Sequence, residues 1–224
     1  TPHATILRAV SEPHAPLADV APELAALVDA CLAKRPVDRP RDASDLRARL
    51  DALAPESDAP TPGFAALAAR GIRFSQAYAT APTTLPSHAS MLTGLTPAGH
   101  GVHENGRRLG DHVPVVAERL SQLGYGTAAF VSGYPLERPF GLARGFERYD
   151  DEFGAGKVER SSRETTDRAL AWLSAGDARP RFLWVHYYDP HEPYEPPEPF
   201  RSRFAADPYQ GEVAAMDHDL ARLL

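Results

Sequence analysis

The feature that most limits the possible folds is a continuous apolar run at residues 182–187 (FLWVHY). A strand with one solvated face alternates apolar and polar residues, whereas a strand covered on both faces is apolar throughout. The run therefore predicts a strand in a parallel sheet that has helices on both faces. Shorter strands are predicted at 72–78 and 127–132, and helices at 62–70, 86–93, 114–123, 159–175 and from 211 onward. This alternation of strands and helices predicts an α/β domain.

The first 54 residues have a different pattern. Two short amphipathic helices are predicted, at 22–34 and at 42–53, with Asp42 as the N-cap of the second. Two such helices bury too little apolar surface to be stable alone, so we expect them to need a partner surface. Residues 55–60 have the composition of a linker. The sequence thus predicts two parts, 1–54 and 61–224.

Composition excludes several classes of function. The net charge of −6 argues against a nucleic-acid partner, which usually requires a basic face. No apolar run approaches the ~20 residues of a membrane span. The single cysteine, Cys31, rules out an internal disulfide and a thiolate metal cluster. The first residues, TPHA, lack an initiator Met, which indicates that the chain begins inside a longer one.

The most informative stretch is residues 81–94 (APTTLPSHASMLTG). Its hydroxyl groups on Thr83, Thr84 and Ser87 come at the start of a predicted helix. Unpaired N–H groups and the helix dipole favour an anionic oxygen there. A hydroxyl beside a divalent cation can act as a nucleophile in sulfuryl or phosphoryl transfer. The alternative is that Thr84 or Ser87 simply caps the helix.

Residues 84–94 (TLPSHASMLTG) resemble the signature of the sulfatases, in the alkaline phosphatase superfamily. That signature is Cys or Ser, any residue, Pro, any residue, Arg, then Ala-Ser-Leu-Leu-Thr-Gly. Further similar segments follow in the family's order: 61–74 (TPGFAALAARGIRF), 94–97 (GLTP), 100–102 (HGV), 105–106 (NG), 140–142 (FGL), 144–146 (RGF), 189–194 (DPHEPY) and 211–214 (GEVA). The resemblance implies a partial parallel-sheet domain over 61–224 and hydrolysis of a small-molecule sulfate or phosphate ester.

The resemblance also implies roles for four residues. Thr84 is the expected nucleophile, Asn105 a hydrogen-bond donor to a substrate oxygen, and His191 a contact to a substrate oxygen or a proton donor to the leaving group. His88 stands in place of the signature arginine and so loses its bidentate fork. Thr84 stands where sulfatases have a Cys or Ser that is oxidised to formylglycine, which threonine cannot form. Both departures favour phosphoryl chemistry.

Without the resemblance, two of these residues have simpler interpretations. Asn105 with Gly106 is typical of a turn, and His191 is typical of a loop. The cluster of Asp189, His191 and Glu192 also allows a metal site.

The resemblance implies a divalent metal, Ca, Mg, Mn or Zn, held mainly by carboxylates. In the family the ligands come from a first strand upstream of residue 61 and from an Asp-His or Asp-Asn pair downstream of residue 224. We therefore predict no metal ligand and no other cofactor in this chain, and little or no turnover from it alone. Residues 44–50 (SDLRARL) echo the family's metal-binding turn, but no buried strand precedes them, so Asp45 is not assigned as a ligand.

Residues 24–40 (LAALVDACLAKRPVDRP) resemble the last helices of a bacterial Ser/Thr protein kinase, in which Arg39 would have a structural role. The sequence contains no Gly-rich loop, ATP-binding lysine, His-Arg-Asp loop or Asp-Phe-Gly, so kinase activity is excluded. Two alternatives to the hydrolase stay open. One is a phosphoryl transferase of the same superfamily, for example of phosphoethanolamine, and the other is a non-enzymatic fusion remnant of a kinase and a sulfatase.

Overall fold

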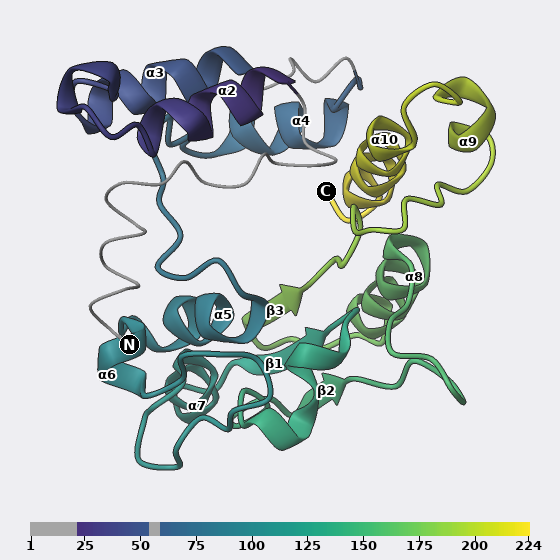
Figure 1. The fold of residues 1–224 in the computed structure, drawn as a ribbon. Helices are drawn as coiled ribbons and strands as arrows, with labels where there is room; N and C mark the ends of the chain where they lie inside the picture. Colours follow the sequence, from purple (N-terminus) through teal and green to yellow (C-terminus); the bar gives the residue numbers. More distant parts are fainter. Residues whose placement is uncertain (1–21, 54–58) are drawn as a thin grey trace. The chain divides into compact units, whose positions relative to one another are not determined.

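The computed structural model describes residues 22–53 and 59–224. The chain forms two compact units, Thr1–Ser57 and Asp58–Leu224. Figure 1 shows the ribbon with the element labels used below. Among the described residues, no helix combines the length and the apolar character needed to cross a membrane.

The first unit contains α2 (Pro22–Cys31), the 3₁₀ turn η1 (Pro36–Asp38) and α3 (Ala43–Leu53). Asp42 Oδ1 accepts a hydrogen bond from Asp45 N at 2.8 Å, which confirms Asp42 as the N-cap. Of the predicted apolar stripe on α2, Leu27 is buried, while Leu24 and Leu32 are exposed. Arg39 Nε donates a hydrogen bond to the carbonyl of Ala33, six residues earlier in the chain. The kinase resemblance of this unit stays a prediction.

The second unit is built on a parallel sheet with the strand order β2-β1-β3. The strands are β1 (Gly126–Phe130), β2 (Arg148–Asp150) and β3 (Arg181–Val185). In the register, Ala129 of β1 lies opposite Tyr149 of β2 and Trp184 of β3. The α/β class and the parallel pairing are therefore confirmed.

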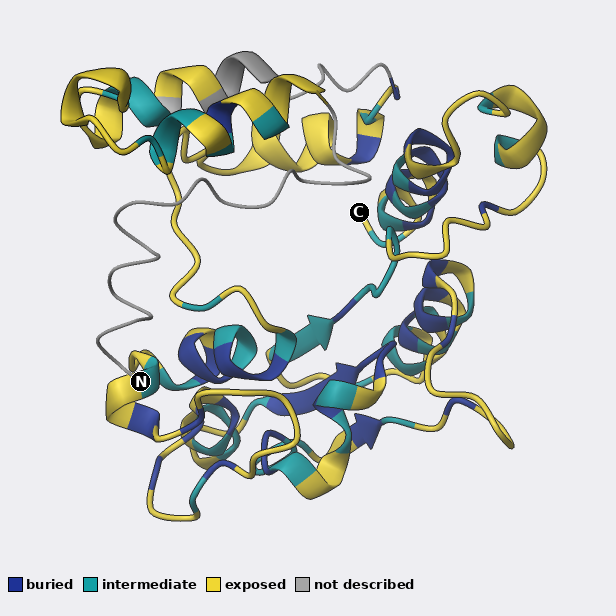
Figure 2. Ribbon diagram, in the orientation of Figure 1, coloured by how far each residue is buried: buried dark blue, intermediate teal, exposed yellow. Residues whose placement is uncertain are grey.

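Helices cover both faces of β1, whose residues are all buried (Figure 2). Ala129 packs in a core with α5 (Thr84–Thr93) and α7 (Val116–Gln122), whereas Ala128 and Phe130 pack against α8 (Ser162–Ser174). The alternation of side chains along a strand produces this division. The other elements are α4 (Pro62–Arg70), α6 (Pro97–His100), η2 (Tyr134–Leu136), η3 (Arg138–Phe140), α9 (Phe200–Arg203) and α10 (Pro208–Ala221).

Three expectations about strands need correction. Residues 72–78 form no strand, and the side chains of Ile72, Phe74 and Tyr78 are exposed, since the described residues provide no strand to pair with them. The apolar run that predicted a strand covered on both faces forms β3, but its residues are only half-buried because β3 is an edge of the three-stranded sheet. The short strand β2 was not predicted, because three residues with the sequence RYD carry no apolar pattern.

The start of α4 is stabilised by a distant residue. Thr61, the residue at the N-cap position, makes no side-chain capping bond. Instead, the carboxylate of Asp217 on α10 accepts hydrogen bonds from Gly63 N and Phe64 N, both at 2.8 Å. A Cβ at Gly63 would lie 2.6 Å from the carbonyl oxygen of Asp217, so only glycine permits this approach. Asp217 thus joins two helices that lie far apart in the sequence.

Candidate active site

The start of α5 is organised by a loop residue. Thr84 is the first residue of the helix, and the preceding Thr83 makes no side-chain capping bond. The N–H of Leu85 donates to Asn105 Oδ1 at 2.8 Å, so Asn105 provides the cap from the loop after α6. The alternative in which Thr84 or Ser87 caps the helix is not supported, since no capping bond from either hydroxyl group is found within the described residues.

The sequence predicted several unpaired N–H groups at this helix start, and the structure reduces that number. Leu85 N is bonded to Asn105, Pro86 has no N–H, and Ser87 N donates to the carbonyl of Thr83. The N–H of Thr84 remains, and no acceptor for it is found within the described part of the chain. An anion here would therefore depend mainly on side-chain donors.

Asn105 can provide such a donor. Its Oδ1 is occupied by Leu85 N, which turns the side-chain NH₂ group away from that bond. Asn105 is exposed, so the NH₂ group is open to solvent. The contact places Asn105 beside Thr84, as the predicted role requires, although the role itself stays a prediction.

His88 lies one turn further along α5 and is held in one tautomer. Its Nδ1 is 2.7 Å from the carbonyl oxygen of Thr84, and because a carbonyl only accepts, Nδ1 carries the proton. Burial lowers the pKa of His88, which favours the neutral ring with a lone pair on Nε2. The position that normally carries a cationic arginine therefore presents a neutral acceptor.

A second histidine, His186, was missed by the sequence analysis. It follows β3 directly and is buried, with its ring centroid 4.8 Å from that of His88 in an edge-on arrangement. Its Nδ1 accepts a hydrogen bond from Ser132 N, and the Ser132 hydroxyl group donates to the carbonyl of His186. Its position inside an apolar run concealed it, although a histidine at the carboxyl end of a parallel strand is a usable signal for a site residue.

His186 should make the stability of this unit depend on pH. Burial, with the neighbouring His88, lowers the pKa of His186 from 6.5 to about 3. Between pH 6.5 and about pH 3, His186 is therefore protonated in the unfolded chain but neutral in the folded chain. The contribution of His186 to the free energy of unfolding is complete above pH 6.5 and decreases as the pH falls. Between pH 7 and pH 5 we expect a loss of about 2 kcal/mol from this group.

The variant His186→Asn tests this expectation, because the asparagine oxygen can replace Nδ1 as the acceptor for Ser132 N. Urea unfolding at pH 7 and pH 5 should show a smaller difference for the variant than for the parent chain. An equal difference in both proteins would show that other groups cause the pH dependence.

His191 is linked to α5 by a series of ring contacts. Its ring stacks on Tyr188 with the centroids 4.1 Å apart, and Tyr188 lies 6.4 Å from His186, which contacts His88. Tyr188 also packs closely on Gly133, where a Cβ would lie 2.7 Å from its ring. The structure therefore groups Thr84, His88 and Asn105 around the start of α5, and connects His191 to them through His186 and Tyr188.

The loop that carries His191 is held by Glu212, another residue whose part the sequence did not reveal. The buried carboxylate of Glu212 accepts from His191 N at 3.0 Å and from Glu195 N at 2.7 Å. Burial raises the pKa of Glu212, while these two donors act in the opposite direction. Glu212 thus fixes the backbone of the DPHEPY segment from α10.

A cavity of about 650 Å³ adjoins His191. Six carboxylic residues line it: Glu159, Glu164, Asp189, Glu192, Glu195 and Glu212. Asp189 is already engaged, since it accepts from Ser162 N at 2.7 Å. Among the described residues, no group of three His, Cys, Asp or Glu side chains is arranged to hold a metal ion. The residues therefore do not fit a resident metal, and the alternative of a metal site at Asp189, His191 and Glu192 is not supported.

The segments that form this site also decide the family. The sulfatase family model matches residues 45–224. The chain belongs to the sulfatase family. The match begins at Asp45 in α3, whose carboxylate accepts from Arg41 N and pairs with Arg49 at 3.0 Å.

Curated sulfatases match over part of their length. An arylsulfatase from Klebsiella aerogenes is 29% identical over 209 residues, which cover 73% of this chain and 45% of that enzyme. The N-sulphoglucosamine sulphohydrolase from Homo sapiens is 31% identical over 140 residues, 58% of this chain and 27% of the enzyme. This chain therefore spans less than half the length of either relative.

Solved structures show the same fold. A structure in complex with D-glucosamine-2-N,6-O-disulfate has a TM-score of 0.56 at 25% identity. The match covers 65% of the present chain and 33% of the chain in that structure. The phosphonate monoester hydrolase of Agrobacterium radiobacter has a TM-score of 0.61 at 19% identity. The match covers 77% of the present chain and 55% of the hydrolase chain. The latter likeness shows the fold alone. Sulfatases in general depend on a divalent metal, which the described residues of this chain are not arranged to hold.

Proposed function

We propose that the start of α5 binds the anionic group of a sulfate or phosphate ester, with Thr84 as the nucleophile. The observation that carries the proposal is the hydrogen bond from Leu85 N to Asn105, which holds an exposed side-chain amide at the residue that follows Thr84. His88, bonded to the carbonyl of Thr84, provides an acceptor from the same helix.

In this proposal each residue has one task. The Thr84 hydroxyl group gives its proton to solvent as its oxygen attacks sulfur or phosphorus, and the bond to the ester oxygen breaks as the alcohol leaves. Water then attacks the same sulfur or phosphorus atom, which releases the inorganic anion and restores the Thr84 hydroxyl group. The NH₂ group of Asn105 donates to an oxygen on which negative charge increases during the attack. His191 supports departure of the alcohol by a contact or a proton, as the family resemblance implies.

Sugar sulfates are the substrate class that the relatives favour. The names of curated relatives refer to N-sulphoglucosamine, N-acetylglucosamine-6-O-sulfate and a hexuronate 2-O-sulfate as the groups acted upon. The lower donor capacity of His88 compared with arginine, and the threonine at position 84, still favour phosphate esters as the second class to test.

We further propose that turnover by this chain alone is slow. The cavity at His191 is lined by six carboxylic residues against the two cations Lys157 and Arg160, so its excess of negative charge disfavours an anionic ester, and no metal-binding group is found among the described residues to offset that excess. The purified chain should therefore bind 4-nitrophenyl sulfate or 4-nitrophenyl phosphate but hydrolyse both esters slowly. Fast hydrolysis after addition of Ca²⁺, Mg²⁺, Mn²⁺ or Zn²⁺ would contradict this part of the proposal.

The variant Asn105→Asp provides the sharpest test of the site. It keeps an oxygen acceptor for Leu85 N, and so preserves the cap, but replaces the donor with a negative charge. We expect at least a tenfold loss of affinity for both esters in calorimetric titration, with unfolding unchanged.

Two further variants complete the test. Gln122→Glu adds the same charge at an exposed position on α7 and should leave affinity unchanged. Thr84→Ala should abolish any residual hydrolysis, whereas Thr93→Ala, at the other end of α5, should not. If Asn105→Asp binds the esters as well as the parent chain does, the start of α5 is not the anion site.

A further inference from the structure

One residue of the candidate site is chemically labile because of the residue that follows it. Asn105 is the single asparagine of the chain, and Gly106 comes directly after it. Since glycine has no Cβ, the backbone nitrogen of Gly106 reaches the side-chain carbon of Asn105 with less steric hindrance than the nitrogen of any other residue would meet. This pair has the composition in which an asparagine side chain cyclises onto the next peptide nitrogen and loses ammonia.

The structure leaves both reacting groups open to solvent. Residues 103–108 are all exposed, and Gly106 adopts a φ of +84°, with nothing within 4 Å of a Cβ built at that position. Within the described part of the chain, the N–H of Gly106 has no acceptor, so no protein hydrogen bond must break before its proton leaves. An ion pair between Arg107 and Glu104, at 2.8 Å, closes the turn around the two residues. The attacking nitrogen is therefore accessible to hydroxide.

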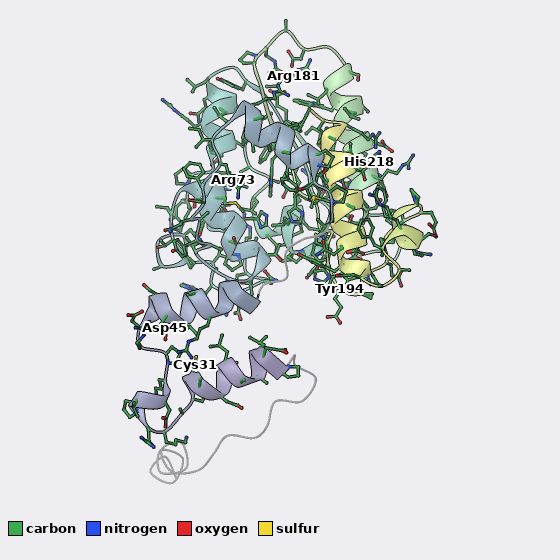
Figure 3. The ribbon with its side chains drawn as sticks, turned by 90° about the horizontal axis from the view of Figure 1, so that it is seen from above. Cys31, Asp45, Arg73, Arg181, Tyr194 and His218 are labelled. Atoms are coloured by element: carbon green, nitrogen blue, oxygen red, sulfur yellow. The ribbon has the colours of Figure 1, made fainter. Side chains whose placement is uncertain are left out.

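The start of α5 polarises the amide group that is attacked. This helix follows the segment that carries Arg73, which is labelled in Figure 3. Leu85 N donates to Asn105 Oδ1 at 2.8 Å, and attack at the side-chain carbon places negative charge on this same oxygen. A donor already fixed on that oxygen stabilises the charge, as in an oxyanion hole, and the positive end of the helix dipole acts in the same direction. The contact that caps α5 therefore also activates Asn105.

We propose that Asn105 and Gly106 form a site of spontaneous deamidation that switches off anion binding. Hydroxide removes the proton of Gly106 N, and this nitrogen bonds to the side-chain carbon of Asn105. The bond to the NH₂ group breaks, and the group takes a proton from water and leaves as ammonia. Water then opens the five-membered imide at one of its two carbonyl carbons. The product is aspartate, or isoaspartate, in which the main chain runs through the former side-chain carbon.

The effect on binding rests on the proposed function. In the aspartate product, a carboxylate oxygen still accepts from Leu85 N, but the NH₂ donor is lost and a negative charge faces the anionic ester. In the isoaspartate product, the main chain of the turn is longer by one carbon atom, which also displaces the carboxylate. Hydrolysis of the imide does not return the amide, so the fraction of chains able to bind the ester decreases with time.

Incubation of the purified full chain at pH 8 tests the reaction. Mass spectrometry of its peptides should show NH₂ replaced by OH at residue 105, at a rate that rises with pH because the attacking nitrogen must lose its proton. The folded chain should be converted at least as fast as the chain unfolded in urea, because a fixed oxyanion donor is worth about 100-fold in rate and offsets the restraint of the folded turn. A folded chain that stays unmodified while the unfolded chain is converted would overturn the inference.

A matched pair of glycine variants tests the attack by Gly106 N. Gly106→Ala places a methyl group beside the attacking nitrogen and should slow the conversion at least tenfold. Gly101 is also exposed, has a φ of +76° and has nothing within 4 Å of a Cβ, but it does not follow an asparagine. Gly101→Ala therefore imposes the same backbone strain and should leave the rate unchanged. Equal slowing in both variants would show that altered loop structure, rather than blocked attack, sets the rate.

Binding measurements then separate this inference from the proposed function. The converted chain, isolated by ion exchange through its added negative charge, should bind 4-nitrophenyl sulfate at least tenfold more weakly than the unconverted chain. If residue 105 is not converted, the deamidation site is wrong and the proposed function stands. If conversion occurs and the affinity does not change, Asn105 does not contact the anion, so the switch and the proposed function are both wrong.

Discussion

Replacing Asp150 with asparagine is expected to lower the free energy of unfolding by about 3–5 kcal/mol, because it leaves a buried guanidinium group without its counter-charge. Asp150 ends β2, and its side chain is only 1% exposed. It pairs with Arg160, which is fully buried, with Arg148 at 2.7 Å and with Arg168 at 3.1 Å. Burial alone would raise the pKa of Asp150, but the bonds from Arg160 and Arg148 outweigh burial and lower the pKa.

Urea unfolding at pH 7.5, followed by tryptophan fluorescence, measures this loss. Both tryptophans, Trp172 and Trp184, lie in the second unit and so report on the sheet. Asp111→Asn is the matched control, since Asp111 pairs with Arg108 at an exposed position and should show little change. The double variant Asp150→Asn with Arg160→Met should recover part of the loss, because it removes the buried charge as well. An Asp150→Asn variant as stable as the parent would show that Arg160 is hydrated rather than held by Asp150.

Replacing Asp217 with alanine is expected to destabilise the packing of α4 on α10 by about 2–4 kcal/mol, because two N–H groups lose the acceptor that the described part of the chain gives them. The two carboxylate oxygens of Asp217 accept from Gly63 N and Phe64 N, and the residue is fully buried. Hydrogen exchange at the amides of Gly63 and Phe64 measures the effect directly. Their protection should fall, while that of β1 amides changes less.

Two other variants separate capping from packing. Asp217→Asn keeps one acceptor and should cost less than alanine. Gly63→Ala keeps the carboxylate but places a Cβ against the carbonyl of Asp217, so it should lower stability through a steric clash between the helices rather than through loss of an acceptor group. Normal protection at residues 63 and 64 in Asp217→Ala would mean that Thr61 or water replaces the cap.

The family motifs named residues that the structure brings near the start of one helix, while the roles of these residues stay a prediction. The signature segment located Thr84 and His88 on one helix, and the structure places Asn105 against the start of that helix. His186, Tyr188 and Glu212 were not predicted, because an apolar run or a helix start in the sequence does not reveal which residues its side chains contact. The acidic cluster at 189–192 suggested a metal site, whereas the described residues contain no metal-binding group of three such side chains and Asp189 Oδ2 accepts a hydrogen bond from Ser162 N.

What the sequence by itself determined is local or periodic. The alternation of strands and helices defined the α/β class, and the helix predicted at 86–93 corresponds to α5, which begins at Thr84. The tertiary structure decided the rest. It formed no strand at residues 72–78, placed β3 at an edge, assigned the caps of α5 and α4 to Asn105 and Asp217, and brought the rings of His88 and His186 into contact. The physical reason is that strand pairing, burial and capping each need a partner group, and in this chain those partners are supplied by distant segments that no local pattern specifies.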